Sequence, residues 1–337
     1  LSEYAKQFVE PSYKSSKLCQ TLLNKDKYVL HIEALRYYMA KGLKVSKVHR
    51  AVSFSQSPWL AKYISHNTEL RKKASSEFEK DFYKLLNNSI YGKTLQNNRK
   101  HIDVRVVTSE KKCQKLTAKP QFKRFEIISD NVVLIELMKK NVVLDRPIYV
   151  GLSVLDLSKL HMYRFHYDVM LPRYGENLQL LFTDTDSLAY HIKTENLYQD
   201  YINLSEHFDL SNFKVSHPCF SSANKKVLGK FKDECADDAA IRFVGLRSKM
   251  YSLELLSEKS KQTAKGIPQR ISRKRKIDEY EDVLVSKVAR HEEFQAIQSK
   301  AHSISTNTIH KISLAPFDDK RVISLDGVSS VPYGFNP

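Results

Sequence analysis

Asp184 and Asp186 lie in the middle of an apolar stretch, "LQLLFTDTDSLAYHI" at residues 178–192. Its Leu, Phe, Tyr and Ile residues predict a buried strand or a tight pair of strands. Burial of one unpaired carboxylate is costly, and burial of two neighbouring carboxylates costs more. The sequence therefore predicts either a turn that brings both carboxylates into solvent or a cation that holds them.

The spacing of the two aspartates favours a hairpin. Because side chains alternate along a strand, one face of the first strand would carry Leu178, Leu180, Phe182 and Asp184. A reversal near Thr185 would then place Asp184 and Asp186 together at the hairpin tip. Two carboxylates there could hold Mg²⁺ or Mn²⁺, since these ions prefer oxygen ligands and share them with substrate phosphates. The alternative is a plain turn sequence, because Asp often bonds to its own backbone in turns.

A second candidate site lies upstream, in "TELRKKASSEFEKDFYKLLNNSIYG" at 68–92. Helical periodicity without Pro or Gly before Gly92 predicts one long helix that ends there. Four residues at helical spacing form one stripe: Lys80, Lys84, Asn88 and Tyr91. Its cationic end could hold a triphosphate, and its ring could stack on a base or sugar. The alternative is a solvated basic face with Tyr91 in the core, although the poor helix formers at 87–89 favour a functional interpretation.

The composition agrees with a polyanionic partner. The chain has 337 residues, 42% of them hydrophobic, which is enough for a sizeable core and two or more subdomains. Its 55 Lys and Arg against 38 Asp and Glu give a formal charge of +17. Nucleic acid is the most economical partner for this charge, although a basic membrane-surface protein would carry it too. No apolar run is long enough for a spanning helix and no signal peptide is evident, so no membrane partner is expected.

The cysteines indicate a reducing setting. None of the four forms a C-x-x-C pair, which argues against a zinc site and a dense disulfide framework. An intracellular protein is the simplest interpretation.

The remaining segments must position the two sites. We expect residues 1–67 to be helix-rich, with "HIEALRYYMAKGL" amphipathic and Gly42 as its stop. Short β-branched runs, "HIDVRVV" and "RPIYVG", predict a β-rich insertion at 101–147 and its border. A second long helix, buried around its circumference, is expected in "SVLDLSKLHMYRFHYDVM". Further strands are expected in "KVLGKFKDE" and "SKMYSLELL", followed by a return to a helical pattern over 272–303.

Three short motifs resemble those of family B DNA polymerases. "KLLNNSIYG" at 84–92 resembles the K-x-x-x-N-S-x-Y-G motif of the fingers, and "FTDTDSL" at 182–188 resembles the D-T-D-S motif of the palm. "SKMYSL" at 248–253 is similar to the K-x-Y element that steadies the primer end. All three stand in the family's order, which together with the charge makes coincidence improbable.

The resemblance implies an α+β fold, a partial right-hand polymerase with an antiparallel palm sheet and long helices. The expected parts are a helix-rich region at 1–67, the fingers helix at 68–100, the β-rich insertion at 101–147, the palm with its metal-binding hairpin at 148–255, and the thumb and C-terminal region at 256–337. "FEKDFYKLLNNSIYGKT", "PIYVGLSVLDLSKLHMYRFHY" and "VGLRSKMYS" look most like the protein-primed subgroup, in particular polymerases of Polinton (Maverick) type mobile elements and related viruses.

The same resemblance implies the roles of individual residues. Asp186 would be the principal ligand, and Asp184 its neighbour, for two Mg²⁺ or Mn²⁺ ions in a complete enzyme. Contacts to the incoming dNTP are implied for Lys84, Lys80, Lys72, Asn88 and Tyr91, the last two beside the nascent base pair. Contacts to template or primer DNA are implied for Ser89, Gly92, Lys249 and Tyr251. A terminal protein that serves as primer is a further implied partner, in a nuclear or viral-replication compartment.

A basic run follows the third motif. It comprises Arg273, Lys274, Arg275 and Lys276. In a thumb these residues could contact duplex phosphates. A nuclear localisation signal and a solvated helix start are the alternatives.

The family's first metal-binding motif, D-x-x-S-L-Y-P, has no match before the fingers helix. "LSEYAKQFVEPSYKSS" at 1–16 contains no Asp, and Asp156 in the look-alike "LDLSKL" is better interpreted as a helix residue. The exonuclease motifs are also missing, which suggests the C-terminal part of a longer polymerase. The expected function is template-directed DNA synthesis. An inactive DNA-binding remnant is the alternative, and a metal-dependent glycosyltransferase that uses D-T-D ranks far lower.

Overall fold

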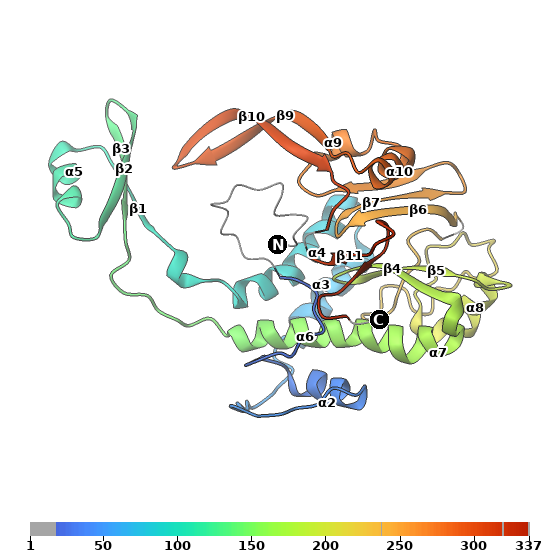
Figure 1. Cartoon of the computed structure of the whole chain (residues 1–337). Coiled ribbons are helices and arrows are strands. Elements are labelled where there is room, and N and C mark those ends of the chain that lie inside the picture. Colours follow the sequence, from blue (N-terminus) through green and yellow to red (C-terminus); the bar gives the residue numbers. More distant parts are fainter. Residues whose placement is uncertain (1–17, 237, 319, 336–337) are drawn as a thin grey trace. The chain divides into compact units, whose positions relative to one another are not determined.

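A computed structural model describes residues 18–236, 238–318 and 320–335. Helices and antiparallel strands are mixed along the chain, as the α+β prediction requires (Figure 1). The chain divides into two compact units. Unit 1 falls within 1–29, 158–295 and 308–337, and unit 2 within 30–157 and 296–307. No helix of the described residues is long and apolar enough to cross a membrane.

The helices of unit 2 that precede the insertion differ from the predicted pattern. They are α2 (Ile32–Ala40), α3 (Ala61–Lys73), α4 (Glu77–Thr94) and the short 3₁₀ helix η1 (Asn98–Lys100). The predicted single helix over 68–91 is wrong, because the backbone becomes extended at Ala74 and a new helix begins after Ser76. Ser76 and Glu79 form a reciprocal capping box, which satisfies amide groups that a helix start leaves unpaired. Gly92 lies inside α4 and does not end it.

Two other expectations for this part of the chain are corrected. Within the described residues 18–60, α2 is the only helix, so the helix-rich interpretation of 1–67 holds for little of that stretch. Gly42 follows α2 with φ +101°, a conformation that favours glycine, which agrees with its predicted role as a stop. The run "RPIYVG" is no strand, because Ile148 begins a helix.

The insertion is β-rich, as predicted. Its elements are β1 (Asp103–Val107), α5 (Glu110–Thr117), β2 (Phe122–Ser129) and β3 (Val132–Leu137), with the antiparallel strand order β1-β3-β2. One sheet face and α5 enclose a small core of Val107, Leu116, Ile135 and Leu137. Glu136 alternates with Ile135 and Leu137 and therefore lies on the opposite face.

Glu136 is buried on that face by basic side chains. Arg124 donates to its Oε1 at 2.8 Å and Lys123 to its Oε2 at 3.2 Å. The third partner is His302, whose Nε2 lies 2.6 Å from Oε1. His302 belongs to the turn between β9 (Arg290–Lys300) and β10 (Ser303–Leu314), where Ala301 and His302 both have positive φ. The tip of this long hairpin is therefore tied to the insertion sheet by one carboxylate.

The second long helix is present but is not buried around its circumference. It runs through α6 (Ile148–Arg164), the π-helical segment η2 (Phe165–Met170) and α7 (Leu171–Tyr174). Leu160 and Phe165 are buried, whereas Leu157, Tyr163 and Tyr167 are at least 39% exposed. Its apolar residues occupy both faces, but only one face is buried.

Unit 1 contains the other strands and several short helices. They are η3 (Gly175–Asn177), β4 (Leu178–Asp184), β5 (Ser187–Ile192), α8 (Leu197–Asn203), η4 (Ser205–His207), β6 (Ala240–Arg247), β7 (Met250–Leu255), β8 (Ser260–Ala264), α9 (Gln269–Ser272), α10 (Ile277–Ser286), β11 (Val322–Ile323) and β12 (Ser330–Val331). "SKMYSLELL" forms β7 with its preceding turn, as predicted. "KVLGKFKDE" forms turns and one isolated bridge at Phe231. The helical pattern predicted over 272–303 holds only to Ser286, because β9 follows.

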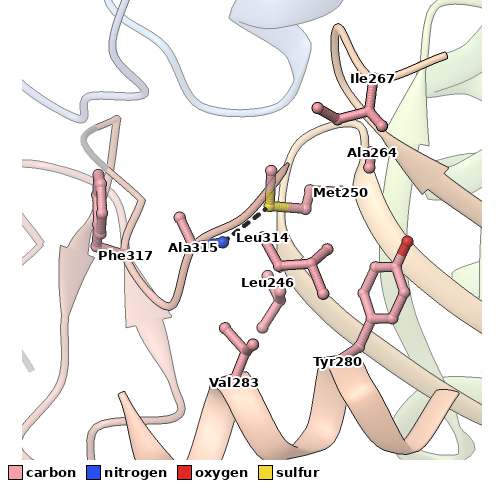
Figure 2. Packing of buried hydrophobic residues seen from close by; sticks show 9 residues of the cluster. All are labelled: Leu246, Met250, Ala264, Ile267, Tyr280, Val283, Leu314, Ala315 and Phe317. Atoms are coloured by element: carbon pink, nitrogen blue, oxygen red, sulfur yellow. Dashed lines mark hydrogen bonds between the residues drawn. The ribbon is translucent and has the colours of Figure 1, made fainter. Parts of the chain in front are cut away.

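Two apolar clusters stabilise unit 1. In Figure 2, α10 contributes Tyr280 and Val283, which pack against Met250 and Leu314. The Ala315 amide donates to Met250 Sδ at 3.4 Å. The second cluster gathers residues from η2, α7 and the chain beyond α8: Phe165, Met170, Tyr174, Phe208, Leu210, Phe213 and Cys219.

The contact at Glu136 yields a pH prediction. The hydrogen bond from Arg124, with those from Lys123 and His302, lowers the pKa of Glu136 from 4.5 to about 2, although burial opposes the shift. Its contribution to stability should therefore be complete above pH 4.5 and be lost as the pH falls toward 2. Glu136→Gln should lower the free energy of unfolding by about 1 to 3 kcal/mol at pH 7. Urea unfolding at several pH values should show the difference from the parent narrowing below pH 4.5.

The matched control is Glu126→Gln. Glu126 lies on the neighbouring strand β2 with 36% of its side chain exposed and a 4.0 Å approach to Arg124. This variant should unfold almost as the parent does at every pH. Equal losses in the two variants would contradict the role assigned to the Glu136 contact.

Candidate active site

The two aspartates lie at the tip of a β-hairpin, as the sequence predicts. Strands β4 and β5 are antiparallel, with Asp184 opposite Ser187 and a two-residue turn of Thr185 and Asp186 between them. Thr185 has φ +55°, and the Asp186 amide donates to Asp184 O at 2.7 Å. The Ser187 hydroxyl donates to the same carbonyl at 3.0 Å. The turn therefore holds both carboxylates at one end of the hairpin.

The predicted face of β4 is wrong because the strand contains a bulge. Leu180 pairs with Tyr190, but Phe182 pairs with Ala189, so Leu181 is an extra residue. Tyr190 and Ala189 point to opposite faces, and Leu180 and Phe182 must do the same. Leu178 and Leu180 therefore share one face, and Phe182 and Asp184 share the other.

Each face of the hairpin has its own contact. Leu178, Leu188 and Tyr190 pack against the second apolar cluster. On the opposite face, the ring of Phe182 stacks on Tyr251, with centroids 4.3 Å apart and planes at 25°. The bulge lets one short hairpin use both faces, because it reverses the alternation between the two contacts.

The K-x-Y motif contacts the hairpin tip directly. Strands β6 and β7 are joined by a turn in which Lys249 has φ +58°. Lys249 Nζ lies 2.8 Å from Asp184 Oδ1 and 2.6 Å from Oδ2. With the stack of Tyr251 on Phe182, the structure brings two separate motifs into one site. The resemblance implied that these motifs share a task, but no sequence signal predicted either contact.

Asp184 and Asp186 offer the right type of ligand for a hard cation but too few ligands to complete a site. Asp186 is exposed, and among the described residues its carboxylate has no hydrogen-bond or ion-pair partner. The Asp184 side chain is 35% exposed and is held by Lys249. Their oxygen atoms are the ligand type that Mg²⁺ and Mn²⁺ prefer. However, within the part of the chain that the structure describes, no group of three or more His, Cys, Asp or Glu could hold an ion.

The predicted stripe on α4 is mostly exposed. Lys84, Asn88, Ser89 and Gly92 are exposed, and Tyr91 is half-buried. Lys80 pairs with Glu77 at 2.6 Å. Lys72 lies on α3 rather than on the same helix, and it pairs with Glu69 at 3.0 Å.

One of the poor helix formers in α4 has a structural explanation. Asn87 accepts a hydrogen bond of 2.9 Å from Asn67, which is buried on α3. Asn88 is exposed, and the Ser89 hydroxyl donates to the carbonyl of Leu86 within the same helix. The contact between α3 and α4 thus explains why an asparagine stands at position 87. No such contact explains Asn88 and Ser89, so the prediction that they serve function still applies to them. Since α4 belongs to unit 2 and the hairpin to unit 1, a shared site of stripe and hairpin stays a prediction.

One residue of the basic run must be removed from the predicted DNA contacts. The Arg275 side chain is only 6% exposed, and its guanidinium pairs with Glu279 at 3.1 Å and Glu292 at 2.5 Å. It also donates to the hydroxyl of Ser313. A buried guanidinium with these partners stabilises the fold and is not available to a phosphate. The exposed members of the run are Arg273, Lys274 and Lys276.

Two nearby histidines have structural roles. The His161 ring stacks on Phe231 and lies 2.8 Å from the carbonyl of Gly229. His166 Nδ1 lies 3.0 Å from the Tyr190 hydroxyl, and burial lowers its pKa. Asp156, in the look-alike of the missing motif, is buried in α6 and accepts from the His31 amide at 2.7 Å. It is therefore a helix residue, as expected.

Comparison with known proteins supports a relation to DNA polymerases. Residues 8–169 match the family model described as DNA polymerase type B, organellar and viral. The match contains α4 and its K-x-x-x-N-S-x-Y-G motif but ends before the hairpin. No curated protein and no solved structure gave a match. The hairpin and the K-x-Y turn are thus supported by their own contacts and not by this match.

The ion pair of Lys249 and Asp184 yields a prediction for metal binding. Removal of the ammonium by Lys249→Met should free the Asp184 carboxylate and tighten Mn²⁺ binding by about two- to five-fold, the equivalent of a pair worth up to about 1 kcal/mol. Mn²⁺ titration followed by electron paramagnetic resonance would measure the change.

The control is Lys261→Met. Lys261 is similarly exposed and pairs with Glu234 at 3.5 Å, away from the hairpin tip. Its substitution should leave Mn²⁺ affinity unchanged. Equal affinities in the two variants would show that Lys249 does not compete with a cation.

Proposed function

We propose that this chain carries part of the nucleotidyl-transfer site of a template-directed DNA polymerase. The reaction would join a dNTP to the 3′-hydroxyl of a primer and release pyrophosphate. The observation that carries the proposal is the contact between the two turns, in which Lys249 holds Asp184 and Tyr251 stacks on Phe182. The K-x-x-x-N-S-x-Y-G motif of α4 has separate support, because it lies within the type B polymerase match.

The residues at the hairpin tip have complementary tasks in this proposal. Asp184 and Asp186 would hold Mg²⁺, which supplies charge relief at the reacting phosphates when it is bound. Once Mg²⁺ neutralises the Asp184 carboxylate, Lys249 would be released from its ion pair and could bind a primer phosphate instead. Tyr251 is fixed by its stack on Phe182, so it offers the primer end a rigid edge beside the aspartates.

The residues on α3 and α4 would bind the incoming nucleotide. Lys84 has no ion-pair partner among the described residues, and the pairs of Lys80 and Lys72 are exposed contacts within one helix. Such pairs are worth little, so a triphosphate can replace the glutamates. Asn88 and Tyr91 would line the nascent base pair. Ser89 and Gly92 would let the template approach, since both have small side chains on an exposed turn of the helix.

We further propose the protein-primed subgroup and the Polinton-like relation. The support is the β-rich insertion between the fingers motif and the hairpin, which the structure describes as a three-stranded sheet with one helix. A terminal protein as primer and a nuclear or viral-replication compartment follow only from this resemblance.

A catalytically inactive, DNA-binding remnant is the second candidate function. The observation that favours it is the absence, from the described residues, of any third acidic residue that could complete the site. A DNA-binding surface would survive such a loss, because the charge of +17 does not depend on the aspartates.

Primer extension with Mg²⁺ separates these two functions. We expect extension by the chain expressed with the sequence that precedes it in its reading frame. Asp186→Asn should lower the rate at least about 100-fold, because it removes charge aimed at the transition state. The matched control is Asp130→Asn, which changes an exposed Asp in the turn between β2 and β3. Equal extension by both variants would overturn the catalytic assignment, and DNA binding without extension by the parent would support the remnant.

The basic run gives a separate prediction for the thumb. Substitution of Arg273, Lys274 and Lys276 by Gln should weaken duplex binding for every sequence and reduce the salt slope by about 2 to 3. Arg275 stays unchanged, since its loss would leave Glu292 without its partner. Fluorescence anisotropy over a salt series measures the slope. A slope equal to that of the parent would refute the thumb contact.

A further inference from the structure

The neck of the insertion forms a second cationic site. The neck comprises residues 96–101, which lead into β1, and 138–147, which return from β3. Asn98 joins the two segments, because its Nδ2 donates to Val143 O at 2.8 Å and to Asp145 Oδ1 at 3.0 Å. Gln96 Nε2 lies 2.8 Å from His101 Nε2. The Asn98 bonds therefore hold the two segments side by side, and the contact of Gln96 with His101 orders the first segment, without regular secondary structure in the second one.

A pocket of about 180 Å³ lies between the two segments. Its polar lining comes from Asn98, His101, Lys139, Asn141 and Arg146, with two valines beside them. None of the described residues that line it is acidic. This volume is below the roughly 300 Å³ at which pockets begin to enclose drug-sized ligands. The pocket therefore fits a small anionic group and not a whole nucleotide.

Four of the five cations of the neck have no partner in the described part of the chain, and Arg146 alone pairs with a carboxylate. Arg99, Lys100, Lys139 and Lys140 are exposed, and their side chains make no hydrogen bond or ion pair with any described residue. Arg146 pairs with Asp145 at 3.4 Å, but its buried Nε has no hydrogen-bond partner among the described residues. Lys139 and Arg146 line the same pocket, so their like charges repel one another and an anion between them would relieve the repulsion.

We propose that the neck binds backbone phosphates of DNA. A phosphate oxygen accepts strong hydrogen bonds from Lys and Arg, and the exposed amide of Asn141 supplies a neutral donor beside them. Both amide hydrogens of Asn98 are used in joining the two segments of the neck. The remaining cations extend along the neck and would contact the next phosphates of the strand. The insertion would thus hold DNA at its base, separately from the hairpin tip. This inference rests on the proposed function for the choice of DNA as the polyanion.

The test compares three exposed lysines of the neck with three exposed lysines of α5 in the insertion. One variant replaces Lys100, Lys139 and Lys140 of the neck by Gln. The other replaces Lys111, Lys112 and Lys115 of α5, which also have no partner among the described residues. Anisotropy with a primer–template duplex from 50 to 200 mM salt should show a slope lower by about 2 to 3 for the neck variant and by less than about 1 for the α5 variant. Equal slopes in the two variants would overturn the proposal.

Two further measurements check the folding of the variants and the source of the phosphate. Both triple variants should unfold thermally at the same midpoint temperature as the parent. If the triple variant of the neck has a lower midpoint, the single variant Lys139→Gln takes its place and should lower the salt slope by about 0.9. Calorimetric titration of inorganic phosphate and dNTP tests a free phosphate as the ligand. Saturable phosphate binding that only the neck variant loses, with an unchanged DNA slope, would refute the backbone as the occupant.

Failure of the neck contact is distinguishable from failure of the proposed function. Asp186→Asn should abolish extension and leave the salt slope intact, because it changes none of the neck cations. Absence of extension by the parent would refute the polymerase activity without affecting the slope comparison. Normal extension with equal slopes would refute the neck contact alone.

Discussion

The ion pair between Lys249 and Asp184 is the contact on which the candidate active site depends. Two carboxylates at one hairpin tip repel each other, and a cation within bonding distance is the simplest way to hold one of them. Lys249 provides it from a different hairpin, at 2.6 and 2.8 Å. The stack of Phe182 on Tyr251 fixes the same two hairpins through apolar area, which does not weaken with salt. Polar and apolar contacts thus align the two motifs together.

This arrangement needs a hairpin with two occupied faces. A regular strand would carry Leu178, Leu180, Phe182 and Asp184 on one face, so Leu178 and Phe182 could not reach two different contacts on opposite faces. The bulge at Leu181 changes that, since Leu178 reaches the cluster around Phe165 while Phe182 reaches Tyr251. The cost of one unpaired residue in the ladder is offset by packing on both sides.

The sequence predicts elements that follow from local chemistry. Residue types sufficed for the hairpin with Asp184 and Asp186 at its tip, for the β-rich insertion and for the long helix from Ser153 onward. They missed the start of that helix at Ile148, in a run predicted to be a strand. The break between α3 and α4 also has a local signal, Ser76 followed three residues later by Glu79, which the uninterrupted helical period obscured. In contrast, the bulge at Leu181 depends on which side chains pack against each face, and no residue of β4 shows it alone.

The burial of Arg275 could not be predicted from the sequence either, because it depends on residues from distant strands. Its position in "SRKRK" is typical of an exposed phosphate contact, but its environment is set by Glu292 and Ser313, which arrive from β9 and β10. Conversely, the neck cations were not conspicuous as a motif, because Lys100 and Lys139 are separated by the whole insertion. A pattern within one segment cannot show which charges the fold will neutralise.

The cationic side chains of this protein are therefore of two kinds, those paired with carboxylates and those without a carboxylate partner among the described residues. Arg275, Arg242 and Arg290 each contact two or more carboxylates, and these cations stabilise the fold. Lys84 and the neck lysines have no such partners among the described residues, so their charge is not needed for packing. Lys249 lies between the two kinds, because its partner is itself a candidate ligand. A cation that can leave its carboxylate only when another cation arrives would couple metal binding at the hairpin to primer binding at the adjacent turn.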